Sequence, residues 1–192
     1  MPTSTLTDLS ILAGVAIANF ICFPKYHAPY TVGVLLVALV YYLVVRKRDP
    51  HLAEEISFRW SPEITRQLVM VLLLLVPGLV WSVTRLGGSE NRLWLVLPLY
   101  LVWGVVQQFL VQWLGVRHLA RWIGNRSTVV VAALLFGGVH IPGGPLFAGL
   151  TALFGATTVA WYLKYRKIVP IGMVHGFLAP IYYAWNRVTF GF

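Results

Sequence analysis

Seven long apolar stretches, separated by short polar segments, dominate the pattern of this chain. They cover residues 9–23, 30–45, 68–83, 93–114, 128–141, 146–162 and 168–185. A helix needs about 20 mostly apolar residues to span a bilayer, and its backbone polar groups must be satisfied within the segment. None of the stretches has the alternation of a barrel strand. We therefore predict an all-α, polytopic transmembrane helical bundle of six to seven spans, with residues 1–192 forming a single integral membrane domain.

The composition supports the membrane prediction. Hydrophobic residues make up 58% of the chain and charged residues 11%, whereas soluble domains carry roughly 25% charged residues. The segment before the first apolar stretch has no Lys or Arg and contains Asp8, so it lacks the basic region of a secretory signal. We expect this first stretch to be a retained span.

The formal net charge of +9 raises the possibility of nucleic-acid binding, but its distribution indicates membrane topology. Most basic residues follow the second, fourth and sixth apolar stretches, in the segments 46–66, 117–126 and 164–167. If every stretch crosses, these segments share one side, and the positive-inside rule makes that side cytoplasmic. The N-terminus is then cytoplasmic and the C-terminus outside. Membrane lipids are the expected partners, and no nucleic acid is expected.

Polar side chains inside apolar stretches are costly and usually face the interior of a bundle. Gln107, Gln108 and Gln112 lie in the fourth stretch, His140 ends the fifth, and His175 lies in the seventh. Taken singly, each has an ordinary explanation. Glutamines can join helices by hydrogen bonds, and a neutral histidine can bond to a backbone carbonyl. Their occurrence together on three separate stretches indicates a shared site.

The order and spacing of these residues resemble a known family. Gln107-Gln108-x-x-x-Gln112, Phe136-x-x-x-His140 and His175-x-x-x-Ala179 are similar to the motifs EExxxR, FxxxH and HxxxN of the CPBP or Abi intramembrane proteases, which include CAAX prenyl endopeptidases. The family-like core covers residues 93–186. The resemblance implies a cell membrane of a bacterium or archaeon, no cofactor and no metal. The positions that match catalytic residues are Gln107, Gln108, His140 and His175, and those that match substrate-binding residues are Phe136, Gln112 and Ala179.

The departures from the family motifs bear directly on activity. In the family the first glutamate is taken to activate water, and Gln107 has no basic oxygen for this step. A general base typically contributes about 10²–10⁴ in rate. The segment from Asn91 to Phe192 contains no carboxylate. Glu54-Glu55-x-x-x-Arg59 spells the missing motif, but it lies in a polar segment, where we expect a solvated, salt-paired loop.

Three functions therefore stay open from sequence. The first is an intramembrane endopeptidase that relies on His140 and His175. The second is a non-catalytic relative that binds or regulates a lipidated or transmembrane peptide or protein, as envelope or bacteriocin-immunity factors do. The third, weaker, is a small transporter or channel. Two histidines are too few for a usual catalytic zinc, and the remaining ones are expected in loops, at His27, His51 and His118.

Overall fold

The computed structural model describes a defined part of the chain. The backbone is described at positions 62 and 65 and over residues 3–22, 27–47, 49–57, 92–141 and 144–190. Side chains are described over residues 5–18, 29–47, 51–57, 98–141 and 144–180, and at positions 49, 62 and 65. All structural statements below concern these residues.

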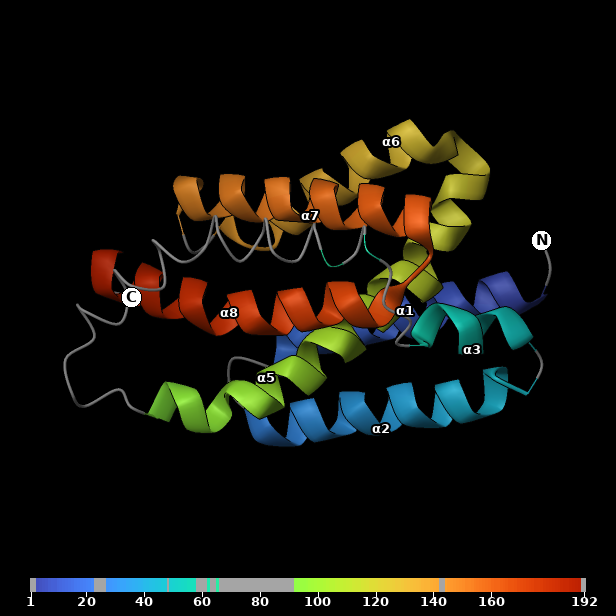
Figure 1. The fold of residues 1–192 in the computed structure, drawn as a ribbon, viewed down its shortest axis with the longest axis horizontal. Helices are drawn as coiled ribbons and strands as arrows, with labels where there is room; N and C mark the ends of the chain where they lie inside the picture. Colours follow the sequence, from blue (N-terminus) through green and yellow to red (C-terminus); the bar gives the residue numbers. More distant parts are fainter. Residues whose placement is uncertain are drawn as a thin grey trace.

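Within this part every regular element is helical (Figure 1). The elements are α1 (Thr3–Cys22), α2 (His27–Val45), α3 (Pro50–Ile56), α5 (Arg92–Gln108), the π-helix η1 (Phe109–Val116), α6 (Arg117–Gly138), α7 (Pro145–Tyr165) and α8 (Ile168–Phe190). The predicted all-α class is confirmed for the described residues. Six of the seven predicted apolar stretches fall on helices, and the stretch 68–83 lies outside the described residues.

Length and apolarity identify two segments of the described chain that could cross a bilayer. They are Pro98–Gly138 and Pro145–Tyr165, and shorter apolar helices cover Thr5–Ala18, Pro29–Val45 and Ile168–Pro180. Large apolar side chains point outward from these helices, among them Leu99, Leu134 and Leu153. Such an outer surface suits hydrocarbon. The predicted count of six to seven crossings stays a prediction.

A close crossing of α5 and α8 forms the centre of the bundle. A Cβ added to Gly104 on α5 would lie 2.3 Å from the Gly172 carbonyl oxygen and 2.4 Å from the Gly176 nitrogen, both on α8. Gly172 and Gly176 are four residues apart, so they lie on one face of α8. Small residues at this spacing let two membrane helices approach to backbone contact. The crossing brings the predicted motifs of the two helices together.

The chain reverses its direction within α6. Gly124 has φ 79° and ψ 163°, a conformation that favours glycine, and it separates a first leg that starts at Arg117 from a second leg that packs along α7 (Figure 1). Thr128 donates a 2.8 Å hydrogen bond to the Gly124 carbonyl at the start of this second leg. The predicted loop between the fourth and fifth stretches is therefore helical on both sides of one glycine.

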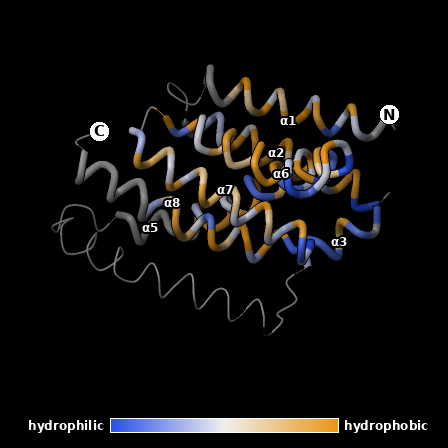
Figure 2. Tube along the Cα trace, turned by 90° about the horizontal axis from the view of Figure 1, so that it is seen from above, coloured by the Kyte–Doolittle hydropathy of each residue, from blue (hydrophilic) through white to orange (hydrophobic). Residues whose placement is uncertain are grey.

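The three basic segments meet at one end of the bundle, where hydrophilic residues gather around α3 (Figure 2). Arg117 at the start of α6 pairs with Asp49 before α3 at 3.1 Å. Arg166, between α7 and α8, pairs with Glu55 of α3 at 3.0 Å. We call this region the polar end. It agrees with the predicted grouping of the three basic segments on one side.

Asp8 joins α1 to this polar end and is almost completely buried. Its carboxylate accepts a hydrogen bond from the Tyr41 hydroxyl, lies 2.6 Å from His118 Nε2 and lies 3.4 Å from Arg117 Nη2. The prediction that His118 lies in a loop was wrong, because it is a buried residue of α6. His51 likewise belongs to helix α3 and His27 begins α2.

Candidate intramembrane site

The glutamine motif lies at the junction of α5 and η1. Gln108 is the last residue of α5, and the π-helix begins at the next residue. Gln112 donates from Nε2 to Gln108 Oε1 at 2.8 Å, and both side chains are fully buried. π-Helical segments are rare and occur frequently at functional sites. The buried amide pair therefore marks a candidate site.

The Gln108 amide extends this hydrogen-bond chain to α8. Its Nε2 lies 2.8 Å from His175 Nδ1. Because Gln108 Oε1 already accepts from Gln112, the amide presents its NH₂ group to the histidine, and Nδ1 accepts. The proton of the neutral His175 ring is then on Nε2, so that atom is a hydrogen-bond donor. A carboxylate at position 108 could only accept a hydrogen bond, so it would favour the tautomer of His175 with the proton on Nδ1.

His140, in the turn that follows α6, has the complementary tautomer. Its Nδ1 lies 2.7 Å from the Phe136 carbonyl, and a carbonyl only accepts, so Nδ1 carries the proton. In the neutral form of this ring the Nε2 atom is a hydrogen-bond acceptor. The ring stacks on Phe136 with centroids 5.8 Å apart and meets Phe147 of α7 edge-on at 5.3 Å. Helices α6 and α7 together hold this ring in place.

Two phenylalanines connect the histidines in space. The Phe136 ring lies 6.0 Å from the His175 ring, in addition to its contact with His140. Phe154 of α7 meets His175 edge-on at 5.2 Å and Phe136 at 6.1 Å. The three predicted motifs thus converge on one cluster, which contains the glutamine pair, both histidines and an aromatic wall. Phe154 and Phe147 were not identified from sequence, because nothing in a single apolar helix distinguishes them.

Two of the predicted site positions contribute less to the cluster. Gln107 is half-buried, and its side chain makes no hydrogen bond to the residues that the structure describes. Ala179 is half-buried on α8 and has no polar atom to offer in place of an asparagine. Gln112, at the position of the family arginine, instead supports Gln108, and its Oε1 is buried without a partner among the described residues.

The literal EExxxR sequence lies elsewhere, at the polar end. Glu54 is mostly exposed and pairs with Lys167 at 3.5 Å. Glu55 is buried and accepts a 2.7 Å hydrogen bond from the Tyr162 hydroxyl, so the expectation of a solvated loop was wrong for this residue. Tyr162 is eight residues beyond Phe154 on α7, about 12 Å at 1.5 Å per residue. These two carboxylates therefore do not reach the histidine cluster.

None of the acids that the structure describes contributes to the cluster. Asp8, Asp49, Glu54 and Glu55 are the acids that the structure describes, and all four are engaged at the polar end. Glu63 and Glu90 lie outside the described side chains. Within the described part of the chain, no group of three metal-ligating side chains comes together.

The fold is a helical bundle with two segments long and apolar enough to cross a bilayer, and it contains a glutamine–histidine site. Residues 88–179 match the family described as type II CAAX prenyl endopeptidase Rce1-like, a match that covers just under half of the chain and supports a CAAX protease-like family. The resemblance read from the motifs is thereby confirmed. Searches of curated proteins and of solved structures gave no match.

Proposed function

We propose that this chain is a non-catalytic member of the CAAX protease-like membrane proteins, which binds a lipidated or transmembrane peptide at the Gln108–His175 cluster. The observation that carries this proposal is the hydrogen-bond chain from Gln112 through Gln108 to His175. Amides occupy the positions of the paired glutamates, and one of them, Gln108, is already bonded to Gln112 and to His175. The polar groups at these positions hold the site together and provide no carboxylate base.

The surroundings of the cluster suit an apolar or peptide ligand. Phe136, Phe147 and Phe154 are half-buried and form a wall against both histidines. Aromatic side chains present large contact areas to apolar groups. The free lone pair on His140 and the N–H on His175 add one acceptor and one donor. Such a combination binds an extended peptide bond beside an apolar chain.

The experiment compares the wild-type protein with the double variant Gln107→Glu, Gln108→Glu in detergent or nanodiscs. Both are incubated with a prenylated and a non-prenylated tagged peptide, and binding and cleavage are measured separately. We expect the wild type to bind the lipidated peptide without cleaving it. Thr157→Ala, on the exposed face of α7, serves as a control for general effects of substitution. Cleavage by the wild type as fast as by the double variant contradicts the proposal.

A second candidate is a peptidase that works without a glutamate. The specific observation in its favour is that both Nδ1 atoms are hydrogen-bonded and both rings contact Phe136. For neutral rings this makes the His140 Nε2 an acceptor and the His175 Nε2 a donor. A water molecule bound between them would donate to His140 and accept from His175. His140 would take a proton from the water as it attacks the peptide carbonyl and return that proton to the leaving amine, while the His175 N–H would turn from the water to the oxyanion of the attacked carbonyl.

This candidate is tested by the variants His140→Ala and His175→Ala. If the histidines perform the reaction, each change lowers the cleavage rate by about 10²–10⁴, as expected for loss of a general base or an oxyanion donor. Thr157→Ala leaves the rate unchanged. Cleavage that survives both histidine changes, or no cleavage by the wild type, rules the candidate out.

The proposed orientation places the polar end in the cytoplasm, with the N-terminus on that side and the C-terminus outside, in a bacterial or archaeal cell membrane. Its support is the meeting of three basic segments at one end of the bundle, which the positive-inside rule assigns to the cytoplasm. A cysteine introduced beside Lys47, with Cys22 replaced by serine, should react with a membrane-impermeant maleimide only after the membrane is opened. Labelling of intact cells at this position contradicts the orientation.

A further inference from the structure

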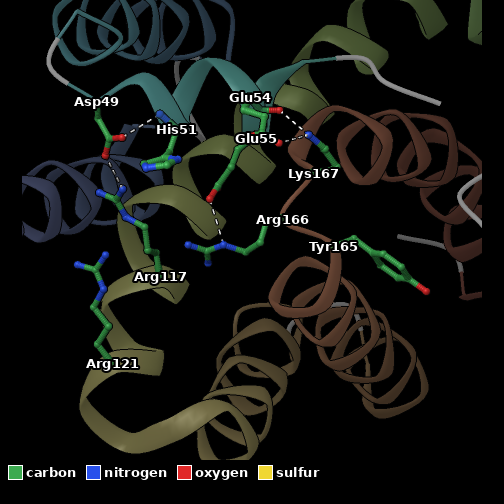
Figure 3. Close-up of a pocket in the computed structure, with 9 residues that line it drawn as sticks. All are labelled: Asp49, His51, Glu54, Glu55, Arg117, Arg121, Tyr165, Arg166 and Lys167. Carbon is green, nitrogen blue, oxygen red and sulfur yellow. Dashed lines mark hydrogen bonds and ion pairs between the residues drawn. The ribbon is translucent and has the colours of Figure 1, made fainter. Parts of the chain in front are cut away.

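A pocket lies at the polar end, on a different part of the bundle from the histidine cluster. It has a volume of about 350 Å³ and is enclosed by α3, the first leg of α6 and the turn between α7 and α8 (Figure 3). This volume is within the usual range of small-molecule sites, roughly 300–1,000 Å³. The walls are almost entirely charged, with Arg117, Arg121 and Arg166 on the basic side.

The acids of the pocket are already neutralised. Asp49 pairs with Arg117 at 3.1 Å, Glu55 with Arg166 at 3.0 Å and Glu54 with Lys167 at 3.5 Å. Burial raises the pKa of the Glu55 carboxyl, although the Tyr162 hydrogen bond and Arg166 act in the opposite direction. Each acidic wall residue therefore has a basic partner, and the pocket retains little free negative charge.

Two guanidinium groups retain capacity for a ligand. Arg121 forms no ion pair with any acid that the structure describes. Arg166 uses Nε for Glu55, which leaves the two terminal nitrogens of its fork, and its side chain is 40% exposed. Figure 3 shows the Arg166 guanidinium pointing across the pocket toward Arg117 and Arg121. An anion between Arg121 and Arg166 would receive donors from both sides.

The backbone at Arg166 indicates that this arrangement is specific. Arg166 ends α7 in the left-handed conformation with φ 53°, and it is the one non-glycine residue of the described chain with a positive φ. Glycine or asparagine is usual at such a position, and other residues are uncommon there. Strained residues of this kind cluster at ligand sites. The conformation turns the side chain back over Glu55 and into the pocket.

We propose that this pocket binds a phosphate group, held between the guanidinium forks of Arg121 and Arg166. Arginine forks match phosphate oxygens in pairs. The pocket lies at the end of α7, a helix long and apolar enough to cross a bilayer, and the end of a spanning helix meets the lipid phosphates. Exposed Arg46, Lys47 and Lys164 make the surroundings basic. The phosphate belongs either to an anionic lipid headgroup or to a soluble phosphorylated molecule. The site is independent of the proposed peptide binding.

The test uses the full chain in phosphatidylcholine nanodiscs and two probes. A calorimetric titration with inorganic phosphate tests for a soluble ligand. Native mass spectrometry after addition of phosphatidylglycerol reports a retained lipid. Arg121→Gln removes one guanidinium group, and Arg166→Lys keeps the positive charge but removes the planar guanidinium that can bind two oxygens at once. Arg126→Gln is the matched control, because Arg126 is exposed on α6 and does not line the pocket.

We expect each pocket variant to weaken binding of the responding probe about tenfold, as for loss of one charge-assisted hydrogen-bonded contact, and Arg126→Gln to change it less than about twofold. A response to inorganic phosphate identifies a soluble ligand, and retention of phosphatidylglycerol alone identifies a headgroup. Equal melting temperatures of Arg121→Gln and wild type show that the fold is intact. No binding of either probe, or equal weakening by Arg126→Gln, overturns the proposal.

Discussion

Gly104 of α5 and Gly176 of α8 approach so closely that a single methyl group does not fit between them. A Cβ on Gly104 would lie 2.4 Å from the Gly176 backbone nitrogen and 2.7 Å from its Cα. The neighbouring residue, His175, accepts the hydrogen bond from Gln108. The distance between the two helix axes therefore determines whether the amide and the histidine meet.

Substitution Gly104→Ala should separate α5 from α8. Its Cβ would meet backbone atoms, which cannot move aside as a side chain can, so we expect a loss of about 1–3 kcal/mol in stability and a weaker Gln108–His175 contact. Thermal unfolding in micelles measures the change. Gly149→Ala on α7 is the control, because its Cβ would meet nothing within 4 Å, and alanine favours a helix. Equal melting temperatures for the two variants would contradict the close crossing.

The Gln112→Met variant tests the hydrogen-bond chain. Methionine fills a similar volume but leaves the buried Gln108 Oε1 without its donor, at a cost of about 1–3 kcal/mol. The Gln108 amide is then free to turn its oxygen toward His175, which would shift the ring proton to Nδ1. Nitrogen NMR of labelled histidine reports the tautomer. Gln107→Met is the control. A tautomer shift of the same size in Gln107→Met would argue against the hydrogen-bond chain from Gln112 through Gln108 to His175.

The Asp8→Asn variant tests the polar end. Asp8 is almost fully buried and contacts Tyr41, His118 and Arg117, and removing one member of a buried charged group typically costs about 3–5 kcal/mol. Asp49→Asn is the matched control, because its side chain is 31% exposed and shares Arg117 as a partner. We expect a loss below about 1 kcal/mol there. Denaturant unfolding of both variants makes the comparison, and a similar loss in both would be inconsistent with the structure.

Glu55 gives the polar end a defined pH dependence. Its pKa in the folded protein is raised above the ordinary value of 4.5, first of all by burial. The folded state therefore holds the proton more tightly than the unfolded state. The stability that Glu55 contributes is full below pH 4.5 and is lost as pH rises through the raised pKa.

The measurement follows thermal unfolding of wild type and Glu55→Gln at intervals from pH 4 upward. We expect the wild type to lose stability relative to Glu55→Gln as pH increases, since the amide keeps a neutral side chain at every pH. Glu54→Gln, the adjacent residue with a mostly exposed side chain, should retain the wild-type dependence. A constant difference between wild type and Glu55→Gln across this range would contradict the assignment.

Much of the site could be predicted because its residues stand out chemically. Gln108, His140 and His175 are polar residues in apolar stretches, and bilayer physics requires them to face the bundle interior. The structure brings these three together with Phe136 as expected. Phe147 and Phe154 could not be distinguished in this way, because the sequence of an apolar helix does not show which residues its aromatic side chains contact.

The polar end was the least predictable part of the molecule. Asp8 and His118 are 110 residues apart, and no local pattern links them. Assigning His118 to a loop followed from its basic neighbours, whereas in the structure one reversal at Gly124 allows helix on both sides. Glu55 was expected to be solvated because the segment is polar, but α3 packs against the end of α7, where the Tyr162 hydroxyl and Arg166 are available.

The π-helix η1 also determines the rotational phase between the glutamine–histidine cluster and the polar end. Its hydrogen bonds reach one residue further than those of an α-helix, so it contains more residues per turn than the helices before and after it. Deleting a single residue between Gln112 and Arg117 would turn the following helix by about 100°. His118 would then face away from Asp8, while Gln108 stayed on His175. The length of this segment, as well as its composition, is therefore part of what holds the polar end and the intramembrane cluster in register.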